Sequence, residues 1–394
     1  MSDLKKNFKI GFIGFGLIGG SIARALKKVN RQSNSLDLNK MNLQANSLIM
    51  SQNYYLFAYD YHRNSPSSDL MTALSDGVLD SVTTSLKEGF PDCDIIFLCA
   101  PVLSNIKYLQ ELKPLMKPTC ILTDVGSVKG NIHTAVEELG LEEQFIGGHP
   151  MTGSEKTGYL NSYSLLMENA YYILTPTDKT PEKMIQILYH LVEQMGSIPI
   201  LLKAKEHDEI TAAISHLPHI IAAQLVNLVR ESDDKSEKMR ALAAGGFKDI
   251  TRIASSSPVM WQDICLTNAA GIKRLLDRYI KSLIDVSNAL SENNGDYLYR
   301  IFDTAGEYRS SIPSKSTGIM EMAFEIYLDI KDEAGAIATL ATLLASNQIS
   351  IKNIGIIHNR EYEEGVLKIE FYEEIGALKA VKLLKSYNYR IYER

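Results

Sequence analysis

The sequence of 394 residues has little of several features that mark particular classes of protein. Its four cysteines lack metal-binding spacing, and three of them lie in apolar, strand-like surroundings where cysteine behaves as a small hydrophobe. It has no excess of positive charge, since a net charge of -6 creates no field to attract a nucleic acid. The apolar run 95–103 is too short to cross a bilayer, and the first strand follows no secretory signal. We therefore expect a cytoplasmic protein with reduced thiols, no metal, no membrane span and no nucleic-acid partner.

Glycines in the stretch KIGFIGFGLIGGS follow the pattern GxGxxG between an apolar strand and an apolar helix. Gly14 would permit a tight turn, Gly16 would let the backbone approach a pyrophosphate, and Gly19 would let the helix pack closely on the strand. The first helical residues, Leu17 and Ile18, would present free N–H groups and the positive end of the helix dipole to the phosphates. The stretch predicts a dinucleotide site, against the alternative of a turn that only reverses the chain.

The chain changes character twice, which predicts three domains. Strands and helices alternate over residues 1–178, as in an α/β Rossmann-type domain, with an Asn/Ser-rich excursion inserted at 29–53. Residues 179–312 have a helical period almost throughout. Within them 210–228 is apolar nearly all round, which is typical of a helix buried in a bundle or in a subunit interface. Residues 319–394 follow the order βαββαβ, which predicts a C-terminal α+β module of the ferredoxin-like kind.

Residues at the ends of two predicted strands are candidates for contact with the cofactor. Asp60 ends the second strand, where a carboxylate bonds the ribose hydroxyls of NAD and repels the extra phosphate of NADP. It lies further from Gly14 than the usual spacing of about 20 residues, which only removal of the insertion restores. Arg63 would instead favour a phosphate, and a turn without a ligand role also stays open for Asp60. Ala100 and Pro101 follow a buried strand and would line the cofactor crevice.

Two loops at strand ends carry polar groups that packing alone does not require. They are DVGSVK, which contains Ser127, and GGHP, which contains His149. With an ordinary pKa of about 6.5, an imidazole is mostly neutral at pH 7 and can take a proton. Hydride removal from a carbon that bears a hydroxyl requires loss of the hydroxyl proton, so His149 is the best placed base. Ser127 would hold the hydroxyl or orient the imidazole, and a hydrogen-bonded loop histidine is the alternative.

The helical half contains the segment SHLPH, residues 215–219. His216 and His219 are three residues apart and share one face of a helix, while Pro218 weakens the hydrogen bonding of the backbone there. They are hydrogen-bonded core groups or part of a pocket wall. A zinc site is conceivable, but no cysteine or carboxylate stands at ligand spacing.

Further along, Arg252 follows the glycine pair that begins at Gly245. Its guanidinium suits a substrate carboxylate, which it would hold with two parallel hydrogen bonds. The alternative is an ion pair with Asp249 or Glu155 at the surface. Trp261 would supply an apolar wall for a ring, or it belongs to the core.

Taken together, these motifs resemble the prephenate dehydrogenases, the TyrA family of tyrosine biosynthesis. The resemblance runs in order through GFIGFGLIGGS, TDVGSVK, GGHPMTGSE, SHLPH, GGFKDITRIA and MW. It implies oxidative decarboxylation of prephenate with NAD to 4-hydroxyphenylpyruvate, carbon dioxide and NADH. It also implies a helical domain that forms a homodimer through interlocked helices.

The resemblance assigns roles to the candidate residues. His149 matches the group that draws off the proton of the ring hydroxyl, with assistance from Ser127. Arg252 matches the group that holds a prephenate carboxylate, and His219 matches one that contacts the substrate. Two acidic residues match groups that gate or orient the arginine: Glu155 and Asp249. We expect the imidazole and the guanidinium to converge on one substrate molecule.

The C-terminal module resembles an ACT domain, a module that commonly binds amino acids between two copies. The segment DEAGAI matches the turn between its first strand and first helix. Ala334 stands where a proline often does, and Gly335, which permits close approach of a ligand, is kept. L-tyrosine as a feedback effector is the favoured interpretation, and plain dimerisation is the alternative.

Three other functions share parts of this sequence pattern. Arogenate dehydrogenase carries out the same chemistry on the transaminated substrate. Hydroxyacid dehydrogenases also join a Rossmann domain to a helical one, but they use a lysine of the helical domain, and the pair of His149 and Arg252 argues against them. A non-catalytic ACT-containing ligand sensor would not need the proton-handling residues.

Overall fold

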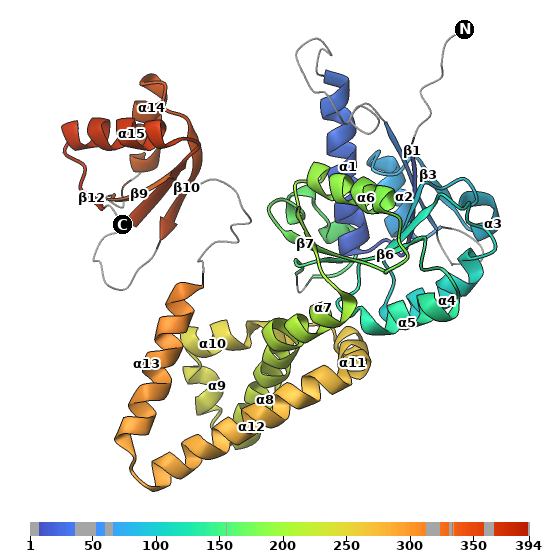
Figure 1. Ribbon diagram of the computed structural model, residues 1–394. Helices are drawn as coiled ribbons and strands as arrows, with labels where there is room; N and C mark the ends of the chain where they lie inside the picture. Colours follow the sequence, from blue (N-terminus) through green and yellow to red (C-terminus); the bar gives the residue numbers. More distant parts are fainter. Residues whose placement is uncertain are drawn as a thin grey trace. The chain divides into compact units, whose positions relative to one another are not determined.

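The structure, a computed structural model, forms two compact units, Met1–Gly318 and Ile319–Arg394, each described here by itself (Figure 1). The residues it describes are 8–35, 53–59, 66–154, 156–312, 324–330, 333, 335–357 and 366–392.

The first unit contains an eight-stranded sheet in the order β3-β2-β1-β4-β5-β6-β7-β8. Strands β1 to β6 pair in parallel, β7 runs antiparallel to β6, and β8 runs parallel to β7. The order reverses between β1 and β4, which is the switch point where doubly wound sheets bind dinucleotides. The strands are β1 Phe8–Ile13, β2 Tyr54–Tyr59, β3 Ser81–Thr83, β4 Ile95–Leu98, β5 Ile121–Asp124, β6 Phe145–Pro150, β7 Tyr171–Pro176 and β8 Ile198–Leu201.

Helices cover both faces of this sheet and bury two separate cores. Phe12 of β1 packs in the core that includes Ile22 of α1, and the next residue, Ile13, packs in the core that includes Leu109 of α4. Successive side chains of a strand point to opposite faces, so a strand buried on both sides is apolar throughout. The first core is covered by α1 Leu17–Ser35, α2 Ser68–Ser75 and α6 Glu182–Gln194, and the second by α3 Leu86–Gly89, α4 Val102–Leu112 and α5 Gly130–Glu138.

The sheet continues past the boundary predicted at residue 178. Leu188 of α6 is fully buried in the same core as α1, and β8 adds a further strand after that helix. A helix that covers a sheet and a helix of a bundle share the same apolar period. The sequence pattern therefore assigns α6 to the helical half, whereas its packing assigns it to the sheet.

The predicted excursion at 29–53 is partly helical, because α1 continues to Ser35. Asn30 ties this end of the helix to the sheet: its amide donates to the Tyr54 carbonyl and accepts from the Tyr54 N–H, both at 3.0 Å. A helix that runs past the sheet edge needs no apolar period, so the polar sequence concealed it. Residues 36–52 lie outside the described part of the chain.

Residues 204–311 form the helical part of the first unit. One continuous helix combines α7 Ala204–Thr211, a π-helical turn Ala212–His216 and α8 Leu217–Ser232. The helical period predicted for 179–312 is interrupted after Leu242 and at Asn268, where one helix ends and the next begins. The remaining elements are α9 Lys238–Leu242, α10 Gly245–Thr251, a 3-10 helix Arg252–Ser255, α11 Pro258–Thr267, α12 Ala269–Ser291 and α13 Gly295–Ser311.

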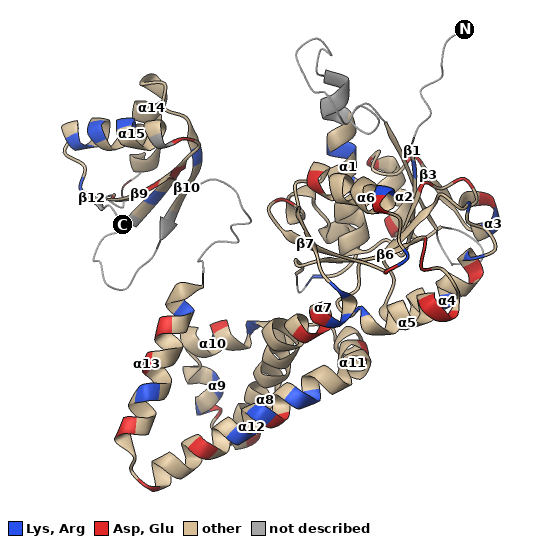
Figure 2. Ribbon diagram, viewed as in Figure 1, with Lys and Arg blue, Asp and Glu red and all other residues tan. Residues whose placement is uncertain are grey.

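The helix 204–232 is long and apolar enough to cross a membrane by length and composition. In the sequence, only the run 95–103 was considered as a possible membrane span, so this helix was missed. Most of it is not covered by the rest of the chain, since Ile214 is 63% exposed and Leu228 60% exposed. Figure 2 shows that α8 carries few charged residues compared with α12. Of the two predicted settings for this helix, burial within the chain's own bundle is wrong, and a subunit interface remains.

The second unit has the predicted order βαββαβ. Its four strands form an antiparallel sheet in the order β10-β11-β9-β12, with an apolar core that includes Leu328, Leu340 and Leu384. Gly335 precedes the first helix with a φ of +91°, a conformation that favours glycine. The elements are β9 Phe324–Asp329, α14 Ala336–Ser346, β10 Ile351–Ile357, β11 Val366–Phe371, α15 Glu374–Ser386 and β12 Ile391–Tyr392.

Candidate active site

The glycine turn lies between β1 and α1, at the switch point of the sheet. Gly14 has a φ of +82°, and a Cβ on it would lie 2.6 Å from the backbone nitrogen of Ala100. A Cβ on Gly19 would lie 3.0 Å from the Gly14 carbonyl oxygen, so this glycine allows the helix to approach the strand. A Cβ on Gly16 would meet nothing within 4 Å, which leaves open space over the turn.

This geometry fits a dinucleotide. The first N–H groups of α1, including those of Leu17 and Ile18, stand next to the open space at Gly16 and can bind a pyrophosphate. On the neighbouring strand end, the Ala100 N–H donates to Asn105 at 3.2 Å, and Pro101 precedes α4. Both predicted strand-end residues therefore lie at the same edge as the turn.

A buried ion pair ties the loop that follows β5 to the carboxyl ends of β5 and β6. Lys129 Nζ lies 2.5 Å from Asp124 Oδ2 and donates to the Gly148 carbonyl at 2.7 Å. Asp124 also accepts from the N–H groups of Gly126 and Gly148, at 2.9 and 3.1 Å. The pair fixes the backbone of Gly148, directly before the catalytic candidate His149.

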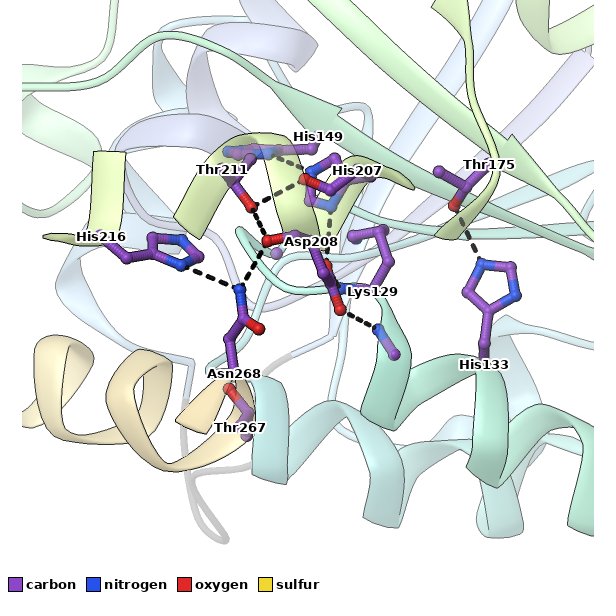
Figure 3. A network of polar contacts seen from close by, with 12 residues as sticks. Lys129, His133, His149, Thr175, His207, Asp208, Thr211, His216, Thr267 and Asn268 are labelled. Carbon is purple, nitrogen blue, oxygen red and sulfur yellow. Dashed lines mark hydrogen bonds and ion pairs between the residues drawn. The ribbon is translucent and has the colours of Figure 1, made fainter. Parts of the chain in front are cut away.

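His149 is the first member of a chain of three side chains (Figure 3). Its Nδ1 lies 2.8 Å from Nε2 of His207, whose Nδ1 lies 2.8 Å from Oδ1 of Asp208. Burial lowers the pKa of His149 well below its ordinary value, and the positive charges of His207, Lys129 and His216 act in the same direction. His149 is therefore a neutral imidazole at pH 7, with one ring nitrogen held by His207.

Asp208 connects the helical half to the nucleotide-binding half. Its carboxylate accepts the backbone N–H groups of Lys129 and Gly130, both at 2.7 Å, at the start of α5. Burial alone would raise the pKa of Asp208, but the hydrogen bond from His207 and these two amides outweigh it and lower the pKa. The carboxylate is consequently ionised in the folded protein.

Ser127 and the buried His216 meet on the other side of Asp208. Burial lowers the pKa of His216 to about 4, although the Asp208 carboxylate and the backbone of Ser127 act in the opposite direction. The amide of Asn268 lies 3.2 Å from His216 Nδ1 and donates to the Asp208 carbonyl at 2.8 Å. The loop that contains Ser127 thus lies against the π-helical turn, a kind of turn that is frequent at functional sites.

His219 and Trp261 form a stacked pair. Their ring centroids are 3.8 Å apart with an interplanar angle of 24°, and His216 contacts the edge of the same indole. His219 Nδ1 lies 2.9 Å from the Ser215 carbonyl oxygen, which leaves its other ring nitrogen for a ligand. The Trp261 N–H is buried and has no hydrogen-bond partner among the described residues. The two histidines of SHLPH therefore form an aromatic wall with the tryptophan.

Arg252, Asp249 and Gly245 lie on α10 and the 3-10 helix that follows it. All three are exposed, and this segment packs against α8. Two other predicted site residues, Asp60 and Glu155, lie outside the described residues. In the part of the chain that is described, no group of three or more His, Cys, Asp or Glu gathers as a metal site would require.

His207 and Asp208 carry little sequence signal. Their segment, AKEHDEIT, has the composition of a solvent-exposed helix face. His207 is nevertheless fully buried, because the loop before α5 covers it. The available signal was an adjacent His-Asp pair directly before an almost wholly apolar helix.

The reversal of strand order at an open glycine turn, together with a half-buried imidazole at the end of β6 in the same sheet, defines a dinucleotide-dependent dehydrogenase. Family models agree: "Prephenate dehydrogenase, nucleotide-binding domain" matches residues 55–201, and "Prephenate dehydrogenase, dimerization domain" matches 203–304. The prephenate dehydrogenase of Bacillus subtilis is 34% identical over 375 residues, which cover 95% of this chain and 94% of that protein. The chain belongs to the prephenate dehydrogenase family.

Solved structures of relatives share the fold. Prephenate dehydrogenase from Aquifex aeolicus, in complex with hydroxyphenyl propionate and NAD+, has a TM-score of 0.66 at 28% identity and covers 79% of this chain and 100% of its own. Arogenate dehydrogenase from Synechocystis has a TM-score of 0.62 at 28% identity, and the match covers 77% of this chain and 99% of that protein. The predicted family, the NAD-dependent oxidoreductase class and the Rossmann and helical dimerisation domains are confirmed.

Proposed function

We propose that this chain oxidises prephenate with NAD to 4-hydroxyphenylpyruvate, carbon dioxide and NADH, as a step of tyrosine biosynthesis. The observation that carries the proposal is a neutral, half-buried imidazole, His149, held by one ring nitrogen at the edge of the dinucleotide fold. A neutral imidazole in that position can take the proton that oxidation of a hydroxyl releases.

The residues at the glycine turn suit NAD. The open space at Gly16 and the N–H groups of Leu17 and Ile18 would hold its pyrophosphate, and Ala100 and Pro101 would line the side towards the nicotinamide. The chemistry that NAD supplies when bound is acceptance of a hydride. The remaining steps fall to side chains of this chain.

In the proposed mechanism, His149 removes the proton of the ring hydroxyl as hydride leaves the same carbon. The O–H bond breaks, an N–H bond forms on the imidazole, and Ser127 orients the hydroxyl. The resulting ketone is conjugated with the ring double bonds and accepts the electron pair released when the bond to the departing carboxylate breaks. The phenolate oxygen formed in this way takes back the proton held by the His149 imidazolium, which gives the hydroxyl of the product. Aromatisation drives this step, so the protein needs only to orient the reacting groups in a dry site.

Substrate binding is assigned to the helical half. Arg252 would hold a prephenate carboxylate through its two parallel N–H groups, with Asp249 and Glu155 orienting it. His219 and Trp261 would contact the ring, and their stacked arrangement supports a role as an aromatic wall. Gly245, at the start of α10, would let the substrate approach the backbone.

The experiment that tests the function follows NADH absorbance with NAD and either prephenate or arogenate. We expect a higher kcat/KM for prephenate. The likeness to the Synechocystis arogenate dehydrogenase makes arogenate the second candidate, and a higher kcat/KM for arogenate would select it. No NADH from either acid would favour a ligand sensor.

Replacement of His149 tests its role as the base. His149→Asn should lower kcat by on the order of 10² to 10⁴ while NAD affinity is kept, because only proton transfer is lost. Turnover close to that of the unmodified protein would remove His149 from this role.

The active form is proposed to be a cytoplasmic homodimer that buries the helical half. The helix 204–232 exposes Ile214 and Leu228, and apolar side chains exposed to this degree mark an interface. A second copy of the chain covering this helix would account for its membrane-like composition without a membrane.

We propose that the second unit is a ferredoxin-like ACT module that binds L-tyrosine. Support comes from its βαββαβ order and from Gly335. The positive φ of Gly335 would strain any other residue, and the space beside its Cα is open, with no atom within 4 Å of an added Cβ. Tyrosine should inhibit NADH formation, and Gly335→Val should abolish the inhibition without changing kcat in its absence. Activity insensitive to tyrosine would leave dimerisation as the role of the module.

A further inference from the structure

We propose that His207 and Asp208 are positioning residues that fix the tautomer of His149, so that its Nε2 lone pair faces the substrate hydroxyl. The inference rests on the proposed role of His149 as the base. It adds two residues from the helical half, neither of which touches the reacting atoms.

The positions of the hydrogens follow from the carboxylate. An ionised Asp208 can only accept, so Nδ1 of His207, 2.8 Å from Oδ1, must carry a hydrogen. A neutral His207 then has its lone pair on Nε2, which lies 2.8 Å from Nδ1 of His149. Nδ1 of His149 must therefore be the donor, and its Nε2 is left without a hydrogen.

That tautomer is the one a base requires. A proton from the substrate can enter only at a ring nitrogen with a free lone pair, and the chain of hydrogen bonds assigns that lone pair to Nε2. When the proton arrives, the Nδ1 hydrogen stays on His149 and remains bonded to His207. The new positive charge is then two hydrogen bonds from the Asp208 carboxylate, which stabilises it.

Rotation of the Asp208 carboxylate cannot exchange the donors and acceptors in the hydrogen bonds from His149 to Asp208. Its Oδ1 also accepts from the Lys129 N–H and its Oδ2 accepts from the Gly130 N–H, so the helix start of α5 holds both oxygens. The other charged or titratable groups near these three side chains are the Lys129–Asp124 pair and His216. In the described part of the chain, neither of them accepts a hydrogen bond from Nδ1 of His149.

The test compares two replacements of His207 with a matched control. In His207→Gln the carboxamide oxygen can still accept from Nδ1 of His149, whereas His207→Leu removes the acceptor. His133→Gln removes a half-buried histidine that bonds Thr175 at 2.9 Å and takes no part in the hydrogen bonds from His149 to Asp208. Each variant is measured for kcat and KM with prephenate, for NAD affinity, and for the protonation of the His149 ring nitrogens by NMR of isotope-labelled histidine.

We expect His207→Leu to lower kcat roughly 10-fold or more, with NAD affinity within about twofold. His207→Gln should recover a large part of kcat, and His133→Gln should leave it unchanged. The NMR spectrum should show a hydrogen on Nδ1 of His149 in the unmodified protein and a shift towards Nε2–H in His207→Leu.

Equal kcat in the unmodified and His207→Leu proteins would overturn the inference, as would Nε2–H on His149 in the unmodified protein. Equal losses in His207→Gln and His207→Leu would show a packing role only and would also overturn it. Failure of the proposed function gives a different result, namely a His149→Asn variant with normal kcat. An inactive His149→Asn beside an active His207→Leu refutes only the positioning role.

Discussion

Lys129 Nζ lies 2.5 Å from Asp124 Oδ2, and neither side chain is exposed to solvent beyond 1%. A buried pair is costly to break, because the remaining charge has no partner in a low-dielectric surrounding. Lys129→Met should therefore lower the free energy of unfolding by roughly 3–5 kcal/mol in urea titrations. The double variant Asp124→Asn, Lys129→Met should regain part of it.

A second pair supplies the control. Lys117 and Asp94 are also 2.5 Å apart but are about a quarter exposed. Lys117→Met should cost about 1 kcal/mol or less. A loss in Lys129→Met no larger than in Lys117→Met would contradict the importance of burial.

Two histidines should make stability depend on pH. Burial lowers the pKa of His133 and of His216 from 6.5 to about 4. Between pH 4 and pH 6.5 the unfolded chain binds more protons than the folded protein. The neutral histidines therefore contribute their full stabilisation of the fold above pH 6.5, and this stabilisation is lost as the pH falls towards 4. Each contributes a slope of about 1.4 kcal/mol per pH unit. Urea unfolding at several pH values measures the slope, and His133→Gln should reduce it; an unchanged slope would count against the shift.

Two glycines of the turn should respond differently to alanine. Gly14→Ala places a Cβ 2.6 Å from the Ala100 nitrogen at a φ of +82°. It should destabilise the fold by roughly 1–3 kcal/mol. Gly16→Ala meets no protein atom within 4 Å, so it should keep the melting temperature and raise the KM for NAD. An unchanged KM in a folded Gly16→Ala protein would argue against a pyrophosphate at this turn.

Arg252 should affect prephenate and not NAD. Arg252→Gln removes a charge-assisted contact and should weaken prephenate binding by roughly 2 kcal/mol, measured as a higher KM. Arg252→Lys should restore it only in part, since an ammonium lacks the planar fork of a guanidinium. If the KM for prephenate stays the same in Arg252→Gln, this arginine does not hold the carboxylate.

The exposed helix should control assembly. Leu228→Glu puts a charge on a side chain that is 60% exposed in the single chain, and it should shift the protein towards monomer in light-scattering measurements. Leu160→Glu is the matched control, because Leu160 is 72% exposed on the nucleotide-binding half and should leave assembly unchanged. The same mass for both variants would place the interface elsewhere.

The fold was predictable where one pattern has one structural solution. The glycine turn after β1 and the alternation up to β6 determine a doubly wound sheet, and the C-terminal order of elements followed from strand and helix periods. The boundary near α6 was not predictable, because its apolar period is the same on a sheet as in a bundle. Packing against α1 decides it, and packing is not local in sequence.

The candidate site was predictable only in part. The sequence predicts a loop at GGHP whose polar residues have no packing purpose, and this made His149 detectable. The predicted loop is wrong, because β6 continues to Pro150 and pairs His149 with Ile173 of β7. His207 and Asp208 lie in a polar helical turn, and the loop before α5 covers them so that His207 is buried and Asp208 half-buried. Long-range contacts of this kind leave no period and no spacing to detect.

The two backbone hydrogen bonds that Asp208 accepts at the start of α5 connect the two halves of the chain, so cutting between the halves separates their functions. A fragment that ends after β8 would keep the glycine turn and His149 but would lose the side chain that holds its ring. Such a fragment should retain cofactor affinity with an imidazole free to rotate, which makes nucleotide binding and proton abstraction separable by truncation.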